Sequence, residues 1–72
     1  MKSDALSLNN FLGCAIADLR KTFGFTQIDF AKIINVSDSS LAHYEQGISF
    51  PSIDTLIRIA DYFHVNVDYL LG

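Results

Sequence analysis

Apolar positions along the chain recur with helical spacing, and turn-forming residues divide the chain into short segments. Leu12, Ile16 and Leu19 are spaced four and three residues apart, as on one face of an amphipathic helix that Gly24 can end. A second stripe with helical spacing follows Pro51-Ser52 and consists of Ile53, Leu56, Ile59, Ala60 and Phe63. Because no window keeps the period of two that marks a strand, the pattern predicts an all-α fold, a compact bundle of four to five short helices.

The chain between these stripes carries the signals of two more helices and a tight turn. Thr26 is placed to cap the first of them, and Asp29 follows three residues later, as in a capping box with Asp in place of Glu. Asn35 tolerates a left-handed backbone, so the chain can reverse there. Ser37 is placed to cap the second helix and Gly47 to end it. These signals predict a pair of short helices over about residues 26–46.

The length of the chain limits it to one hydrophobic core. A chain of 72 residues buries roughly 60% of its unfolded surface, enough for a single small domain over residues 1–72. Residues 1–8 precede the first apolar stripe and are predicted as a short N-terminal extension. Towards the other end, Asn66 is placed to cap a short last helix, from which Leu70 would return to the core.

Composition and charge indicate a cytosolic globular protein. Apolar residues make up 50% of the chain, and the formal net charge is −3. No apolar run approaches the ~20 residues needed to span a bilayer, and the first residues lack the basic-then-apolar layout of a signal peptide. We therefore expect a cytoplasmic location and no membrane partner. The single cysteine, Cys14, cannot form an internal disulfide, which agrees with a reducing compartment.

Residues that could carry catalysis or bind metal are few. One cysteine and two separated histidines, His43 and His64, give no zinc-ligand spacing, and the chain has no glycine-rich phosphate loop. Cys14 would need a nearby base to act as a nucleophile, and its neighbours indicate instead a helix face packed into the core. His64 lies beside apolar residues at a predicted helix end and is interpreted as structural. The sequence thus predicts no metal site, no cofactor and no enzymatic activity.

The predicted helix pair has the layout of a helix-turn-helix. In this motif the second helix enters the major groove of DNA, which is about 12 Å wide, while the first helix crosses the backbone and braces it. The second helix must therefore present small side chains where it approaches the groove. The small side chains at this point of the chain are Ser37, Ser39, Ser40 and Ala42.

The order and spacing of several residues connect this layout with a known family. The marks are Leu19-Arg20, Thr26-Gln27, Ala31, Val36-Ser37, Tyr44-Glu45, Gly47 and Pro51. With these marks, the chain resembles the Xre family of phage-repressor and Cro-type regulators from about residue 12 to residue 72. The resemblance implies a lambda-repressor-like DNA-binding domain of a bacterial or phage transcription regulator. It also implies that the regulator binds operator DNA as a homodimer. Whether such binding represses or activates a gene depends on where the operator lies relative to the promoter.

The resemblance assigns roles to residues by their position in the motif. Asp38, Ser39 and His43 would face base edges of double-stranded DNA. Contacts to phosphates, or bracing of the reading helix, would come from Thr26, Gln27, Ser37, Ser40, Gln46 and Ser49. Arg20 would form a structural ion pair with Glu45. Surplus apolar residues near the C-terminus would form the homodimer interface, for which we name Val65, Val67, Tyr69 and Leu71.

Two of these base contacts also have a simpler interpretation. Asp38, in the first turn of its helix, gains a few tenths to about one kcal/mol from the helix dipole even without DNA. Alternatively, its carboxylate accepts a hydrogen bond from a cytosine N4 amino group in the major groove. His43 is either a solvated polar residue or a donor to guanine. The sequence alone leaves both pairs of alternatives open.

The charge balance weighs against tight DNA binding. The chain has five Lys and Arg residues against eight Asp and Glu residues, and the segment 36–47 contains no Lys or Arg. Backbone amides at helix starts bind phosphate without cations, and a dimer doubles every contact, so DNA remains the leading partner. The alternative is a regulatory protein partner, with the fold serving as an adaptor or antirepressor, or as the DNA-reading half of a system controlled by another chain.

Overall fold

The chain folds into helices joined by short loops. The computed structural model describes the backbone of residues 4–72 and the side chains of residues 10–72. Within that range it has five helices and no strand, which confirms the all-α prediction. The helices are α1 Asp4–Thr22, α2 Gln27–Ile33, α3 Asp38–Gln46, α4 Ile53–Phe63 and α5 Val67–Leu71. Since α1 begins at Asp4, residues 4–8 of the segment predicted as an extension form the first turns of this helix.

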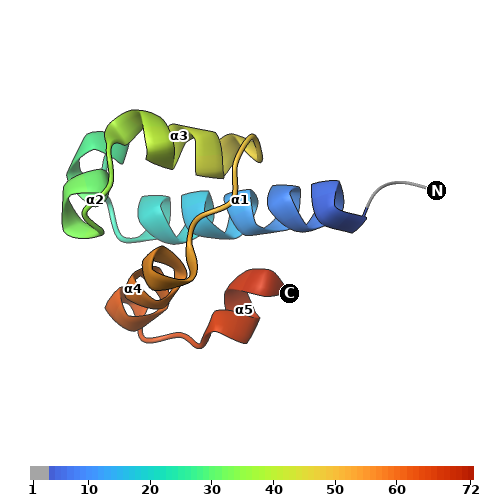
Figure 1. Ribbon diagram of the computed structural model, residues 1–72. Helices are drawn as coiled ribbons and strands as arrows, with labels where there is room; N and C mark the ends of the chain where they lie inside the picture. Colours follow the sequence, from blue (N-terminus) through green and yellow to red (C-terminus); the bar gives the residue numbers. More distant parts are fainter. Residues whose placement is uncertain (1–3) are drawn as a thin grey trace.

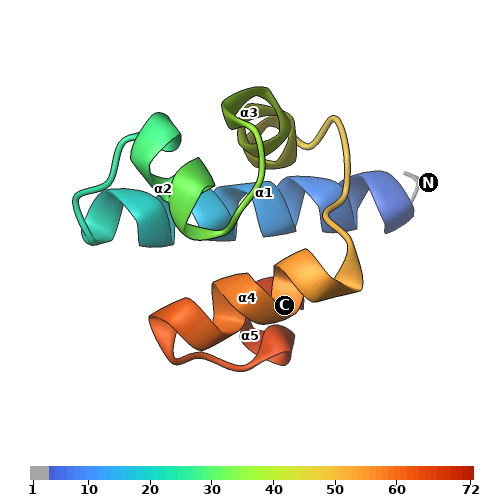
Figure 2. The same cartoon turned by 60° about the vertical axis from the view of Figure 1, so that its left-hand side comes forward.

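The longest helix, α1, runs through the middle of the molecule (Figure 1). α3 lies on one side of α1, with α2 beside it, and α4 and α5 lie on the other side (Figures 1 and 2). The loop after α3 carries the chain back across α1 to α4. As a result, α3 has neighbours on one side only, and its other side faces away from the bundle.

Each of the helices α2 to α5 begins directly after a capping residue, and for α2, α3 and α5 it is the residue that the sequence predicts. The side chains that accept a backbone N–H three residues further on are those of Thr26, Ser37, Ser52 and Asn66. A cap of this kind typically stabilises a helix by about 1 kcal/mol. α2 is followed by Asn35, whose φ of 62° is left-handed, as predicted for the tight turn.

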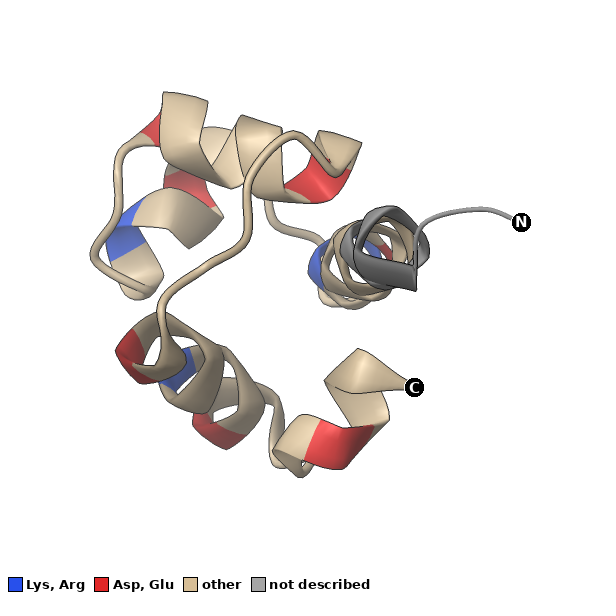
Figure 3. Ribbon diagram, turned by 45° about the vertical axis from the view of Figure 1, so that its right-hand side comes forward, with Lys and Arg blue, Asp and Glu red and all other residues tan. Residues whose placement is uncertain are grey.

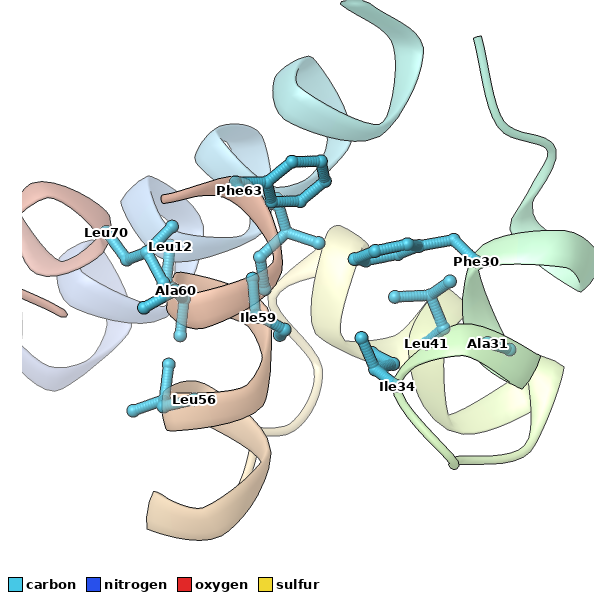
Figure 4. Packing of buried hydrophobic residues seen from close by; sticks show 11 residues of the cluster. Leu12, Phe30, Ala31, Ile34, Leu41, Leu56, Ile59, Ala60, Phe63 and Leu70 are labelled. Carbon is cyan, nitrogen blue, oxygen red and sulfur yellow. The ribbon is translucent and has the colours of Figure 1, made fainter. Parts of the chain in front are cut away.

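The core draws side chains from all five helices (Figure 4). Phe30 of α2 is fully buried, and its ring centroid lies 5.2 Å from that of Phe63 on α4. The buried apolar residues are Leu12, Ile16, Phe30, Ala31, Ile34, Leu41, Leu56, Ile59, Ala60, Phe63 and Leu70. Because this cluster reaches every helix, it fixes α3 relative to the rest of the domain through Leu41.

Two predictions about burial are wrong. The sequence places Cys14 in the core, but Cys14 is exposed. Leu12 and Ile16 form the inner face of α1, and at about 100° of rotation per residue position 14 lies on the opposite face. Ile53 is assigned to the buried stripe of α4, yet it is 68% exposed. It is the first residue of α4, and the inward-facing positions begin only with Thr55.

Candidate nucleic-acid interface

α3 has fixed ends and one anchored face. Ser37 Oγ accepts the backbone N–H of Ser40 at 3.0 Å and donates to Ser40 Oγ at 2.9 Å, which caps the start of the helix. Gly47 ends the helix with a left-handed φ of 77°, a conformation that glycine adopts without strain. Leu41 is buried on the inner face. The outer face is therefore held in one orientation by the fold itself.

A nearly buried ion pair attaches the end of α3 to α1. Arg20 Nε donates to Glu45 Oε2 at 2.7 Å, and Arg20 Nη2 donates to Glu45 Oε1 at 3.1 Å. The two side chains are only 11% and 7% exposed. Arg20 Nη1 also donates to the carbonyl oxygen of Phe25 at 2.8 Å, and Gln27 Nε2 donates to Glu45 Oε1 at 2.9 Å. The structure contains the pair that the resemblance implies, and Gln27 extends it to the start of α2.

α1 and α3 also touch through their backbones at Gly13, which the sequence reasoning did not single out. A Cβ placed on Gly13 would lie 2.6 Å from the carbonyl oxygens of both Tyr44 and Glu45. Only a residue without a side chain permits this approach. The one available signal was the position of Gly13 inside a helical stripe, between Leu12 and Ile16. Glycine lowers helix stability there, so its presence indicates a close contact.

The three residues predicted to contact base edges lie on the outer face of α3. Asp38, Ser39 and His43 are all exposed, whereas Leu41 is buried on the other face. Asp38 Oδ1 accepts the backbone N–H of Ser39 at 3.0 Å. This bond engages one oxygen of the carboxylate and holds the side chain at the start of α3, so both interpretations of Asp38 remain compatible with its position.

The six residues predicted to contact phosphates or to brace α3 fall into two groups. Four of them form hydrogen bonds within the protein, and these are Thr26, Gln27, Ser37 and Ser40. Gln46 is exposed at the end of α3, and Ser49 is half-buried in the loop that follows. The bonds of Thr26, Ser37 and Ser40 lie within one helix start each, and the bond of Gln27 joins α2 to α3. The side chains of Gln46 and Ser49 form no hydrogen bond within the described residues.

Few Lys and Arg residues lie along the described helices (Figure 3). Arg58 Nε donates to the carbonyl oxygen of Ile34 at 2.9 Å and Arg58 Nη2 donates to Thr55 Oγ1 at 3.2 Å, so this arginine braces α4 against the end of α2. In the described part of the chain, Lys21 and Lys32 are then the two cations whose side chains form no recorded hydrogen bond. α3 itself carries acidic residues and no Lys or Arg.

The four residues predicted to form a dimer interface differ in exposure. Val65, Val67 and Leu71 are half-buried and pack against the core. Tyr69 is 56% exposed. It lies at a hollow of about 210 Å³ between α1 and α5, whose other lining residues are Phe11, Cys14, Ala15 and Asp18.

Among residues whose side chains are described, no three His, Cys, Asp or Glu residues are placed to hold a metal ion. His64 is the C-cap of α4, with a left-handed φ of 58°, which fits its interpretation as a helix-end residue. No helix in the described part of the chain is long and apolar enough to cross a membrane.

The sequence of this chain matches known regulators over most of its length. Residues 16–70 match the model of the helix-turn-helix family. The HTH-type transcriptional regulator ImmR of Bacillus subtilis is 34% identical over 61 residues, which cover 85% of this chain and 48% of ImmR. The chain spans about half the length of the curated relatives it matches.

Two solved structures share the fold of this chain. The SOS-response transcriptional repressor LexA from Eubacterium rectale has a TM-score of 0.88 and 25% identity, covering 100% of this chain and 74% of that chain. The P22 c2 repressor in complex with a synthetic operator has a TM-score of 0.81 and 24% identity, covering 86% of this chain and 94% of that chain. The second likeness concerns the fold alone. Together they confirm the lambda-repressor-like architecture that the resemblance implies.

Proposed function

The chain belongs to the Xre-type helix-turn-helix family, and we propose that it is a transcriptional repressor that binds a near-palindromic operator in double-stranded DNA as a homodimer. The observation that carries the proposal is the outer face of α3, which is polar and exposed while its inner face is fixed by Arg20, Glu45 and Gln27. A rigid, outward helix with small side chains suits the major groove. The name of ImmR, an HTH-type transcriptional regulator, supports the same function.

The proposed complex depends little on cations. The first-turn amides that the capping bonds leave unused can donate to phosphates, near the positive end of each helix dipole. They are the N–H groups of Asp38 on α3 and of Ile53 and Asp54 on α4. Lys21 and Lys32 can add a small number of ionic contacts per subunit. We therefore expect each subunit alone to bind the operator with modest affinity and the dimer to bind it more tightly. A regulator of this kind acts in the cytoplasm, where its operator lies.

The salt dependence of binding tests the proposed function. Each neutralised phosphate releases counterions, so the affinity for a labelled duplex should fall steadily as the salt concentration rises from about 50 to about 300 mM. A contact between apolar protein surfaces would not weaken in this way. Fluorescence anisotropy of the duplex measures the slope. Binding that salt leaves unchanged would argue for a protein partner.

Replacement of Asp38 by Asn should change which bases the protein prefers. A carboxylate only accepts hydrogen bonds, whereas an amide also donates, so the preference for cytosine at one half-site position should be lost. We expect a loss of roughly 1–3 kcal/mol of discrimination at that position, measured by competition among duplexes that differ in one base pair.

Asp54→Asn is the matched control for this prediction. Asp54 also lies in the first turn of its helix, so the control repeats the change in dipole interaction on α4 without touching α3. If the Asp38 variant ranks all duplexes as the wild type does, then Asp38 does not read a base and acts only at the helix start.

Replacement of Tyr69 by Asp should separate the proposed dimer. A carboxylate at the exposed rim of the α1–α5 hollow would lose its hydration when a second subunit covers it. We expect a folded monomer whose operator affinity is at least about tenfold lower, since one subunit alone makes half of the contacts. Ile57→Asp is the control, because Ile57 is also exposed but lies on α4. Light scattering that gives an unchanged mass for the Tyr69 variant would place the interface elsewhere.

A second candidate function has one observation in its favour. The loop after α3 and the start of α4 expose large apolar side chains, among them Ile48 at 62% and Ile53 at 68%. Apolar groups beside an acidic reading helix suit a protein partner better than they suit phosphates. In that case the domain would act as an adaptor or antirepressor. The salt measurement described above separates the two functions.

A further inference from the structure

The outer face of α3 has a central position that none of the predicted DNA contacts uses. At about 100° per residue, this face combines Asp38, Ser39, Ala42, His43 and Gln46. Four of these residues are exposed polar side chains, and Ala42 is half-buried among them. Ala42 follows Asp38 by four residues and precedes Gln46 by four, so it lies one helical turn from each.

The side chain of Ala42, between Asp38 and Gln46 on this face, is both small and apolar. Its side chain is a single methyl group, whereas the residues one turn before and after it, Asp38 and Gln46, carry longer polar side chains. Ala42 is therefore the one apolar position on this face. A polar base edge gains nothing there, because a methyl group offers neither a donor nor an acceptor.

The major groove displays one apolar feature on its base edges, the C5 methyl group of thymine. We propose that Ala42 reads a thymine by packing its methyl group against that of the base. This inference rests on the proposed DNA-binding function and adds a specificity-determining residue to it. The rise of about 6 Å between Asp38 and Ala42 along α3 corresponds to roughly two base-pair steps of 3.4 Å. The thymine therefore lies within about two base pairs of the base that faces Asp38.

Uracil substitution tests this contact without altering hydrogen bonding. In the best selected duplex, each thymine is replaced in turn by uracil, which removes only the methyl group. The wild-type protein should lose about fourfold in affinity at one thymine of each half-site, the loss expected for one buried methyl-sized group. With Ala42→Gly, the same replacement should cost nothing at that thymine and leave the others unchanged.

Two further variants serve as a control and as a substitute for Ala42→Gly. Ala17→Gly removes the same methyl group from a half-buried position on α1 and should retain the fourfold dependence on thymine. Ala42→Ser keeps more helix propensity than glycine, so it serves if Ala42→Gly folds poorly, and it too should lose the dependence. Circular dichroism confirms that each variant is folded.

The outcomes separate this inference from the proposed function. If a duplex is selected but no thymine shows a methyl effect, or if Ala42→Gly keeps the effect in full, the inference is overturned while the function stands. If no duplex is selected, the proposed function fails and the inference fails with it.

Discussion

Replacing Arg20 by Met should lower the free energy of unfolding by about 3 kcal/mol, because it leaves the carboxylate of Glu45 nearly buried without its cation. Methionine keeps much of the apolar stem, so the loss reports the guanidinium group. The carboxylate would retain only the hydrogen bond from Gln27. For a domain of this size, a loss of about 3 kcal/mol is a large share of a total stability on the order of 5 to 10 kcal/mol. Urea unfolding followed by circular dichroism measures the change.

Two control variants identify the cause of that loss. Lys21→Met removes a cation from the next position, where the side chain is exposed and has no recorded hydrogen bond, and should change stability by less than about 0.5 kcal/mol. The double variant Arg20→Met with Glu45→Leu removes both charges and should recover much of the loss. Equal effects for Arg20 and Lys21 would mean that the ion pair contributes nothing specific to the domain.

Replacing Gly13 by Ala should destabilise the domain and weaken DNA binding together. The added methyl group would lie 2.6 Å from two backbone oxygens of α3, so the two helices must move apart. Overpacking against backbone costs about 1–3 kcal/mol, partly offset by the better helix propensity of alanine, which is worth roughly 0.5–1 kcal/mol. We expect a net loss of about 1–2 kcal/mol and at least tenfold weaker binding, because α3 is displaced from the position set by Glu45.

Cys14→Ala is the neighbouring control for this substitution. Cys14 lies on the exposed face of α1, so the change should leave the stability close to that of the wild type. A Gly13→Ala protein as stable as the wild type would show that α1 and α3 adjust to the methyl group without cost. The backbone contact would then not set the position of the reading helix.

The helix boundaries could be predicted because local residues encode them. Ser37 caps α3 through a bond to a residue three positions away, and Gly47 ends it through its own left-handed backbone. Asn35 sets the turn in the same local way. Each signal depends on the nearest few residues, so a single sequence contains all the information that is needed.

Burial and long-range contacts could be predicted only in part. Helical spacing already places Cys14 opposite the inner face of α1, and its burial was inferred wrongly from its apolar neighbours in the sequence. Ile53 shares the spacing of the α4 stripe, but spacing does not show that the buried positions begin only after the first two residues of that helix. The hydrogen bond from Arg58 to Ile34 and the contact of Gly13 with α3 join segments far apart in the chain. The roles of the exposed residues on α3 remain predictions, since exposure permits a DNA contact without requiring one.

The most direct measurement of DNA recognition is selection of bound sequences from random duplex DNA by the purified protein at low salt. Enrichment of a near-palindromic sequence is expected, with half-sites one duplex turn apart, about 34–36 Å, and with binding that weakens as salt rises. Such a sequence would also define the duplexes for the Asp38 and Ala42 tests. No enrichment by a folded protein that is dimeric in solution would contradict operator binding and favour a protein partner.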